Sequence, residues 1–153
     1  MASDDCKDAC PAAGEICWLE VPCTDIDRAL SFYSAVLGWE SANPEGCPSP
    51  LPGPMEGTDA VHMFRRGRMH GAFVKMSSPD GVAAVADAAH PAKAPVLASY
   101  NVSSIEETLA KVEAAGGRVH VPKTAIAGGS MGYFARFVDT EGNLQGIWEA
   151  PAN

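Results

Sequence analysis

The sequence predicts an α+β fold in which two tandem βαβββ modules form curved mixed sheets around a central cavity. The first observation is an internal repeat, because residues 25–38 (DIDRALSFYSAVLG) align without a gap with residues 104–117 (SIEETLAKVEAAGG). In both copies the apolar residues recur at the spacing of an amphipathic helix, and both copies end at glycine, which tolerates the left-handed conformation that closes a helix. The second observation is that a short apolar segment precedes each helix, at residues 16–23 and 96–102. Each copy therefore contains a strand, a helix and a stop signal in the same order.

The first copy predicts one helix and four strands. Thr24 or Asp25 is expected to cap the helix, because a short polar side chain there accepts a hydrogen bond from the first turn. Trp39 opens the second strand. Residues 59–65 and 69–76 then predict an antiparallel pair of strands that turns at an Arg-Gly-Arg sequence.

Two segments are predicted to lie outside the regular strands. Residues 43–58 contain five of the twelve prolines and three glycines, and proline cannot donate to the hydrogen-bond ladder of a sheet. Long loops of this kind often cover a site. Residues 78–95 are rich in alanine and flanked by proline, which predicts a linker between the copies with room for a helical turn.

The second copy repeats the order of the first. Its helix is predicted over residues 104–115 and begins at a capping box that starts at Ser103 or Ser104. Three strands are predicted to follow, at residues 118–121, 131–138 and 143–149.

Length and composition favour one domain. The chain has 153 residues, of which 46% are hydrophobic, so it has room for one core of ordinary size. Residues 1–14 are expected to form a disordered tail and residues 15–150 a single domain. Within that domain, the first module is expected at about 15–77, the linker at about 78–95 and the second module at about 96–150.

The charge of the chain excludes two classes of partner. With 11 basic and 19 acidic residues the net charge is -8, and no basic stripe is present, so neither nucleic acid nor an anionic membrane is expected to bind. No run of about 18 apolar residues occurs, and acids stand where a signal peptide carries its basic region, which predicts a cytoplasmic protein. The five cysteines are odd in number and favour free thiols, with Cys17 and Cys23 expected beneath the first helix.

Several short motifs occur in a fixed order along the predicted domain. They are Trp18-x-Glu20, Asp25-x-x-Arg28-Ala29-x-x-Phe32-Tyr33, Leu37-Gly38-Trp39, Ala114-Ala115-Gly116-Gly117 and Asp139-x-Glu141-Gly142-Asn143-x-x-Gly146-x-Trp148-Glu149. Their order, and their occurrence in both copies, resemble the vicinal oxygen chelate superfamily of glyoxalases, bleomycin-resistance proteins and extradiol dioxygenases. The resemblance implies paired βαβββ modules whose curved sheets enclose a cavity. It also implies that, in metal-using members, each module supplies one ligand from its first strand and one from its last strand, and the metal polarises a substrate with two adjacent oxygens.

The four positions that correspond to those ligands carry no metal-binding side chain. Counted back from the two helix N-caps, the first-strand positions are Trp18 and Leu97. The last-strand positions, identified from the repeated glycine, are Gly71 and Gly146. None of these residues offers a side-chain donor that holds a divalent metal, so we predict no metal and no other cofactor.

Strand alternation predicts how the cavity is lined. If Trp18 points inward, Glu20 does so too, and Lys75 points inward together with Phe73. A carboxylate and an ammonium group that share a pocket can transfer protons, or they can form a salt bridge that holds two strands together. Trp18, Phe73 and Trp148 are expected to form apolar walls for a flat ligand, with ordinary core packing as the alternative.

Four further residues are candidates for contact with a substrate. His62 and His70 lie on strands joined by a short turn, so either is a candidate acid or base near neutral pH. Tyr133 and Arg136 lie on opposite faces of one strand, so at most one of them is expected to face the cavity. Tyr133 would orient a carbonyl group and Arg136 would hold a carboxylate; surface packing is the alternative for each of the four.

These residues leave three functional hypotheses. The favoured one is a small-molecule-binding enzyme, a metal-independent isomerase, lyase or cyclase that acts on a carbonyl-rich metabolite, with Glu20, Lys75, His62 and His70 as its acids and bases. The second is a protein that sequesters a drug or metabolite, as in the bleomycin-resistance branch, and needs only shape and aromatic walls. The third is a metal-dependent lyase or dioxygenase with a displaced divalent-metal site at Glu20, His62 and His70. A homodimer is also expected as a possible assembly, since the resemblance implies that such modules often pair between chains.

Overall fold

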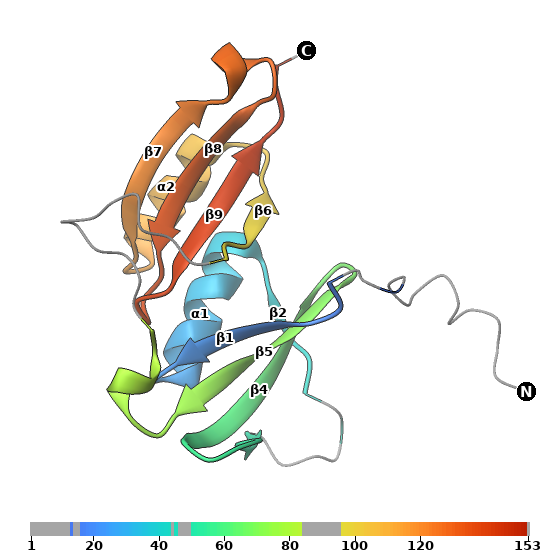
Figure 1. Cartoon of the computed structure of the whole chain (residues 1–153), viewed down its shortest axis with the longest axis vertical. Helices are drawn as coiled ribbons and strands as arrows, with labels where there is room; N and C mark the ends of the chain where they lie inside the picture. Colours follow the sequence, from blue (N-terminus) through green and yellow to red (C-terminus); the bar gives the residue numbers. More distant parts are fainter. Residues whose placement is uncertain (1–12, 14–15, 44, 46–49, 84–95, 153) are drawn as a thin grey trace, which may run out of the picture.

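Two sheets, each covered on one face by one helix, make up the part of the chain that the computed structural model describes (Figure 1). This part comprises residues 13, 16–43, 45, 50–83 and 96–152. Most of the tail predicted at residues 1–14 and most of the predicted linker lie outside it. None of the described helices is long and apolar enough to cross a membrane.

The first module builds one sheet around one helix. Its elements are β1 (Leu19–Cys23), α1 (Ile26–Leu37), β2 (Glu40–Ser41), β3 (Leu51–Pro52), β4 (Thr58–Arg66) and β5 (Met69–Met76). The strands follow the order β1-β5-β4-β2, and the short β3 pairs with β4 as well. β1 and β5 are parallel, and the other pairs are antiparallel.

The second module repeats this topology. Its elements are β6 (Ser99–Asn101), α2 (Ile105–Ala114), β7 (Arg118–Ala125), β8 (Tyr133–Val138) and β9 (Leu144–Glu149). The strand order is β6-β9-β8-β7, with β6 parallel to β9 and the other pairs antiparallel. In both modules the first strand lies beside the last, so the predicted α+β fold with two βαβββ modules is confirmed.

The predicted boundaries differ from the observed ones mainly at the strands. β7 continues to Ala125 rather than ending near residue 121, with irregular pairing to β8 along its length. The proline-rich segment predicted as a loop contains β3, in which Pro52 lies at the edge of the sheet, where its missing N–H costs no ladder hydrogen bond. Cys23 is buried beneath the first helix as predicted, but Cys17 is exposed because it precedes β1.

Both helices begin at the predicted cap residues, and α1 ends at the predicted glycine. α2 ends with Ala115 as its C-cap, and the left-handed conformation after it belongs to Gly116 (φ 93°) rather than to Gly117. The Asp25 side chain accepts a hydrogen bond from the backbone N–H of Arg28 at the start of α1, and the Ser104 side chain accepts one from Glu107 at the start of α2. At the end of α1, Gly38 adopts a φ of 69°, a left-handed conformation that glycine tolerates. These local signals are why the helix bounds were predicted within one residue.

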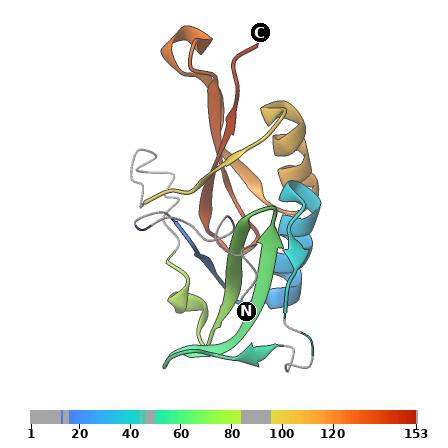
Figure 2. The same cartoon turned by 90° about the vertical axis from the view of Figure 1, so that its right-hand side faces the viewer.

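One apolar core joins the two modules on the side where the helices lie. Figure 2 shows α1 and α2 stacked along one side of both sheets. Five aromatic side chains of the first module pack together there, and the stacked pairs Tyr33–Trp39 and Trp39–Phe64 have ring centroids 4.3 and 4.2 Å apart. Apolar residues of α2, β8 and β9 complete the same core: Ile105, Val112, Ala135, Phe137 and Ile147.

A buried polar network connects α1 with the hairpin between β8 and β9. The hydroxyl of Tyr33 donates to a carboxylate oxygen of Asp139 at 2.7 Å and accepts a hydrogen bond from the amide of Gln145 at 2.9 Å. The other Asp139 oxygen accepts from the backbone N–H groups of Glu141 and Asn143. Burial raises the pKa of Asp139 above its ordinary value, although these hydrogen bonds act in the opposite direction. The network therefore fixes the hairpin to the helix of the other module.

Glu141, at the tip of the same hairpin, caps the start of α1. Its side chain is fully buried and accepts backbone N–H hydrogen bonds from Thr24 at 2.9 Å and Asp25 at 3.0 Å. Both carboxylate oxygens also accept hydrogen bonds from the Arg28 guanidinium, at 2.7 and 3.0 Å. Burial alone would raise the pKa of Glu141, but the hydrogen bonds from Arg28, Thr24 and Asp25 outweigh it and hold the pKa below its ordinary value.

Removing this carboxylate is expected to destabilise the fold. Glu141→Ala leaves the donors of Thr24, Asp25 and Arg28 without their acceptor, so we expect the free energy of unfolding to fall by about 2 to 3 kcal/mol. Glu113→Ala, on the exposed surface of α2, is the matched control and should change it by less than about 0.5 kcal/mol. Urea denaturation measures both values, and equal values for the two variants would contradict the role assigned to Glu141.

The same contact has a pH signature. The pKa of Glu141 in the folded protein lies below the ordinary value of 4.5. The contribution of the Glu141 charge to the free energy of unfolding is therefore complete above pH 4.5 and is lost as the pH falls through the folded pKa. The stability difference between the wild-type protein and Glu141→Gln should therefore shrink as the pH falls below 4.5.

Candidate functional site

Each sheet has one face covered by a helix and one face that is not, which we call the helix-free face. The helix-free faces of the two sheets differ in how much space they leave for a ligand. On the sheet of the first module, Val61, Ala72 and Val74 form a small apolar cluster with Leu51 and Met76. All three central residues are at least nine-tenths buried by the chain itself. This face is therefore filled by its own side chains.

The corresponding face of the second sheet is open. Phe134 and Arg136 of β8 lie on it together with Trp148 of β9, since Phe134 pairs with Trp148 and Arg136 with Gly146. With Leu97 and Ser99 they line a hollow of about 470 Å³. Gly146 contributes no side chain, and Leu97, Ala98 and Ser99 of the neighbouring segment pack directly against it.

A second hollow adjoins the first where the two modules meet. It has a volume of about 560 Å³ and is lined by the segments that lead into β1 and β6, with Trp18 and Leu97, and by the start of β5, with His70. Leu97 and Ser99 line both hollows. We call the combined hollow the concave site and define it by the following residues: Trp18, His70, Leu97, Ser99, Phe134, Arg136 and Trp148.

The aromatic and cationic groups of the concave site are positioned by the local backbone. The indole N–H of Trp148 donates to the carbonyl of Met131 at 3.1 Å, and the ring lies close to Gly132, where a side chain would collide with it. Arg136 is half-buried, and within the described part of the chain no carboxylate forms an ion pair with it. A guanidinium without a partner beside two aromatic rings is suited to a flat ligand that carries a negative charge.

The predicted pairing of Glu20 with Lys75 is wrong. Glu20 pairs with Ala72 and Lys75 pairs with Cys23, so the two side chains leave the sheet on opposite faces. Glu20 is exposed on the helix-free face, whereas Lys75 lies near the start of α1 beside Asp25 and Asp27. The prediction assumed that Trp18 and Phe73 share a face, and the observed register of β1 against β5 separates them.

Two of the predicted ligand-contacting residues lie in other surroundings. Phe73 has no exposed surface and packs in the core against Tyr33 and Phe64, so it forms no wall of the concave site. Tyr133 lies on the helix side of β8, where its ring is 4.5 Å from the ammonium group of Lys123. Arg136 lies on the opposite face, as strand alternation predicted.

The two predicted histidines are not neighbours. His62 pairs with Phe73 and faces the helix side, where its ring nitrogens lie 2.8 Å from the Ser41 hydroxyl and 3.3 Å from the Asn43 amide. His70 pairs with Arg65, on the other face, and lines the concave site. Opposite faces of the sheet also rule out the displaced metal site that was proposed for Glu20, His62 and His70.

The observed register corrects one of the four positions inferred for metal ligands. Glu20 pairs with Ala72 in the first module and Ser99 pairs with Gly146 in the second, and Glu20 and Ser99 occupy equivalent places before the helix N-caps. The equivalent of Gly146 is therefore Ala72 rather than Gly71. Ala72 has no donor atom either, so the residues at these positions do not fit a divalent metal. Among the described residues, no group of three His, Cys, Asp or Glu side chains is placed to hold one.

Three residues of the concave site, Phe134, Leu97 and Ser99, were not predicted from the sequence to line it. Phe134 precedes Arg136 by two residues and shares its face, so strand alternation alone was sufficient to find it. Leu97 was considered only as an empty ligand position, although it lines both hollows.

Comparison with known proteins gives a family and a set of similar folds. The family model described as Glyoxalase/Bleomycin resistance protein/Dioxygenase superfamily matches residues 15–146. A search of the curated proteins finds no match. Three of the most similar solved structures are all less than 25% identical and therefore show the fold alone.

One of them is the hypothetical protein SA1046 from S. aureus, with 20% identity and a TM-score of 0.59 over 91% of this chain and 100% of that one. The second is the fosfomycin resistance protein FosX from Listeria monocytogenes, complexed with Mn(II) and a dihydroxypropylphosphonic acid, with 10% identity and a TM-score of 0.63 over 91% and 92% of the two chains. The third is TnmS3, an antibiotic binding protein from Streptomyces sp. CB03234, with 16% identity and a TM-score of 0.56 over 93% and 99%.

The surroundings of His62 predict its titration. Burial lowers the pKa of His62 below its ordinary value of 6.5, so the folded protein should keep this ring neutral to a lower pH than the unfolded chain does. Stability is then unaffected by His62 well above pH 6.5 and decreases as the pH falls through the window below it. An NMR titration of the ring measures the folded pKa, and a midpoint above 6.5 would contradict the half-buried position on the helix side.

Proposed function

The chain belongs to the glyoxalase/bleomycin resistance protein/dioxygenase superfamily, and within it we propose that this protein binds a flat, aromatic or conjugated small molecule carrying a negative charge. The ligand lies in the concave site and is held there without chemical change. This proposal takes the sequestering hypothesis over the enzymatic one.

The observation that carries the proposal is the position of Arg136 beside the cross-strand pair Phe134–Trp148 on an open sheet face. The ring of Trp148 is already fixed by its hydrogen bond to Met131, so little side-chain entropy is lost when a ligand stacks on it. Arg136 supplies the charge, and Leu97 and Trp18 extend the apolar surface toward the junction of the modules.

Two further facts support binding over catalysis. The acid–base pair that the enzymatic hypothesis needed, Glu20 with Lys75, is split between the two faces of the sheet. One solved structure with the same fold is an antibiotic binding protein.

A metal-independent acid–base enzyme is the second candidate, because Glu20 and His70 both lie on the helix-free face of the first sheet. Both side chains are exposed, and His70 lines the junction of the modules, where a bound carbonyl compound would come within its reach. A metal-dependent reaction is not proposed, since Trp18, Ala72 and Gly146 at the ligand positions provide no donor. The predicted homodimer stays a prediction.

The proposed binding can be tested with a pair of matched fluorescent probes. The first probe, 8-anilinonaphthalene-1-sulfonate, is a flat anion, and N-phenyl-1-naphthylamine is its neutral counterpart. Trp148→Ala should weaken the binding of both probes by about tenfold, because each loses its stacking surface. Arg136→Gln should weaken only the anionic probe, by about tenfold, because it removes one charge-assisted contact.

Arg118→Gln is the matched control, since Arg118 is exposed at the start of β7 and lines neither hollow. It should leave both dissociation constants unchanged. If the ratio of the dissociation constants of the two probes is the same for Arg136→Gln as for the wild-type protein, the anionic ligand class is wrong. If Trp148→Ala binds both probes normally, the site itself is wrong.

The enzymatic candidate predicts a different result. The wild-type protein would convert a conjugated carbonyl compound, followed by absorbance and mass spectrometry, and Glu20→Gln would abolish the conversion while keeping affinity for the compound. Glu113→Gln is the control. Conversion that survives Glu20→Gln would eliminate Glu20 as the acid or base.

A further inference from the structure

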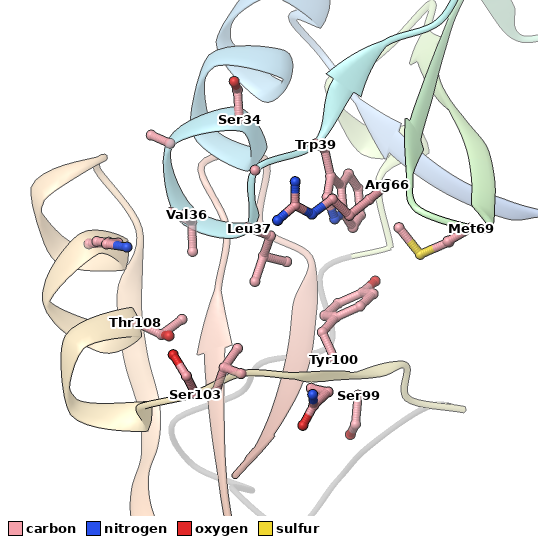
Figure 3. A pocket seen from close by; sticks show the side chains of 15 residues that line it. Ser34, Val36, Leu37, Trp39, Arg66, Met69, Ser99, Tyr100, Ser103 and Thr108 are labelled. Carbon is pink, nitrogen blue, oxygen red and sulfur yellow. The ribbon is translucent and has the colours of Figure 1, made fainter.

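A second cleft, of about 580 Å³, lies between the end of α1, the β4–β5 turn, β6 and α2, and it shares Ser99 with the concave site. Figure 3 shows Arg66 beside Trp39 on one wall and Thr108 with Ser103 on the opposite wall. Tyr100 lies between these walls in the same view. Phe134, Arg136 and Trp148, the main binding groups proposed above, take no part in lining it.

The charge of this cleft is opposite to that of the chain. Its only charged lining residues are Arg66 and Lys111, whereas the chain as a whole has a net charge of -8. In the described part of the chain, neither cation forms an ion pair. Hydroxyl groups and one amide make up most of the other polar lining, from Ser34, Ser99, Asn101, Ser103 and Thr108.

The internal repeat shows what fills the equivalent space in the other half of the molecule. The helix N-caps Asp25 and Ser104 are 79 residues apart, so Thr24 corresponds to Ser103 and Pro22 to Asn101. Around the start of α1, the space is filled by the β8–β9 hairpin. Its Glu141 accepts the N–H groups of Thr24 and Asp25, and its Asn143 donates to the carbonyl of Pro22 at 2.8 Å.

The corresponding hairpin of the first module is too short to do the same. Arg66 pairs directly with Met69, which leaves a two-residue turn, whereas five residues separate the paired Val138 and Leu144. The short turn therefore provides no carboxylate side chain that contacts the start of α2. The backbone N–H groups of Ser103 and Ser104 find no acceptor among the described residues, whereas the N–H of the next residue, Ile105, donates to the carboxylate of Glu149 at 2.7 Å. The cleft is the counterpart of the place that Glu141 and Asn143 occupy in the other half.

We propose that this cleft is a second binding site, for a small organic acid with more than one carboxylate group. One carboxylate takes the position at the N–H groups of Ser103 and Ser104 that the Glu141 side chain takes at Thr24 and Asp25. Arg66 and Lys111 neutralise the remaining negative charge. The apolar groups of Leu37 and Tyr100, which are partly exposed, contact the carbon chain of the ligand.

Arg66 also has a structural role that the test must separate from binding. Its guanidinium lies against Gly38, at the end of α1, where a positive charge is favourable to the helix dipole. If that is its only role, replacing Arg66 lowers stability and leaves the affinity for an acid unchanged.

The test uses glutarate as the probe and 1,5-pentanediol, which has the same carbon chain without charge, as the matched ligand. In a ¹H–¹⁵N NMR titration of the wild-type protein, glutarate should shift the amide signals of Ser103 and Ser104 with saturation, and the diol should not. The double variant Arg66→Gln/Lys111→Gln should bind glutarate at least about tenfold more weakly.

Arg65→Gln is the control, because Arg65 adjoins Arg66 on β4 but points to the other face of the sheet, where it contacts Glu40 at 3.4 Å. It should keep wild-type affinity for glutarate. Unsaturated or absent shifts at Ser103 and Ser104 in the wild-type protein would overturn the proposal whether or not the variants fold. Equal affinity of the double variant and the wild-type protein would overturn it as well. Because Arg136 plays no part in this titration, failure here is distinct from failure at the concave site.

Discussion

The contact of Glu141 with the start of α1 is the constraint on which the arrangement of the two modules depends. It brings a buried carboxylate of the second module to two backbone N–H groups and one guanidinium of the first. Asp139, two residues earlier, holds its own hairpin closed and accepts the hydroxyl of Tyr33 from the aromatic core. Because these groups lie on one short turn, the position of the second sheet follows from the position of α1. The concave site, which both modules line, depends on that relation.

Because the fold is an internal repeat, it contains two equivalent helix-free sheet faces and two equivalent spaces at the helix N-termini. Side chains and turn length decide which member of each pair is filled. On the helix-free faces, Val61 and Val74 close the first sheet, while Arg136 and Trp148 leave the second sheet open. On the helix side, the long β8–β9 turn closes the space at α1, while the short β4–β5 turn leaves a cleft at α2. A duplicated fold thereby acquires two different binding surfaces without any change in strand order. Each surface carries an arginine, Arg136 or Arg66, that forms no ion pair with any other described residue, in a chain of net charge -8, which favours the local capture of anions.

The elements that the sequence predicted well are those with local causes. The bounds of α1 and α2 follow from Asp25, Ser104 and Gly38, whose effects reach only the adjacent turn. The residues of β5 were predicted without error for the same reason, since turn residues precede them directly. The opposite faces of Tyr133 and Arg136 also follow from alternation within one strand, which needs no knowledge of its neighbours.

The sequence by itself therefore determined the repeat, the helices, the fold class and the lack of donor side chains at the inferred ligand positions. Only the tertiary structure decided which face of each strand meets the helices, because that depends on register between strands distant in sequence, and a change of one residue exchanges the faces. For this reason Glu20 and Lys75, which were predicted to share one pocket, lie on opposite faces of the sheet. For the same reason the residue equivalent to Gly146 is Ala72 and not the predicted Gly71. Tertiary structure also decided which of the equivalent spaces stayed open, because turn length and packing across the repeat, rather than local propensity, fill them.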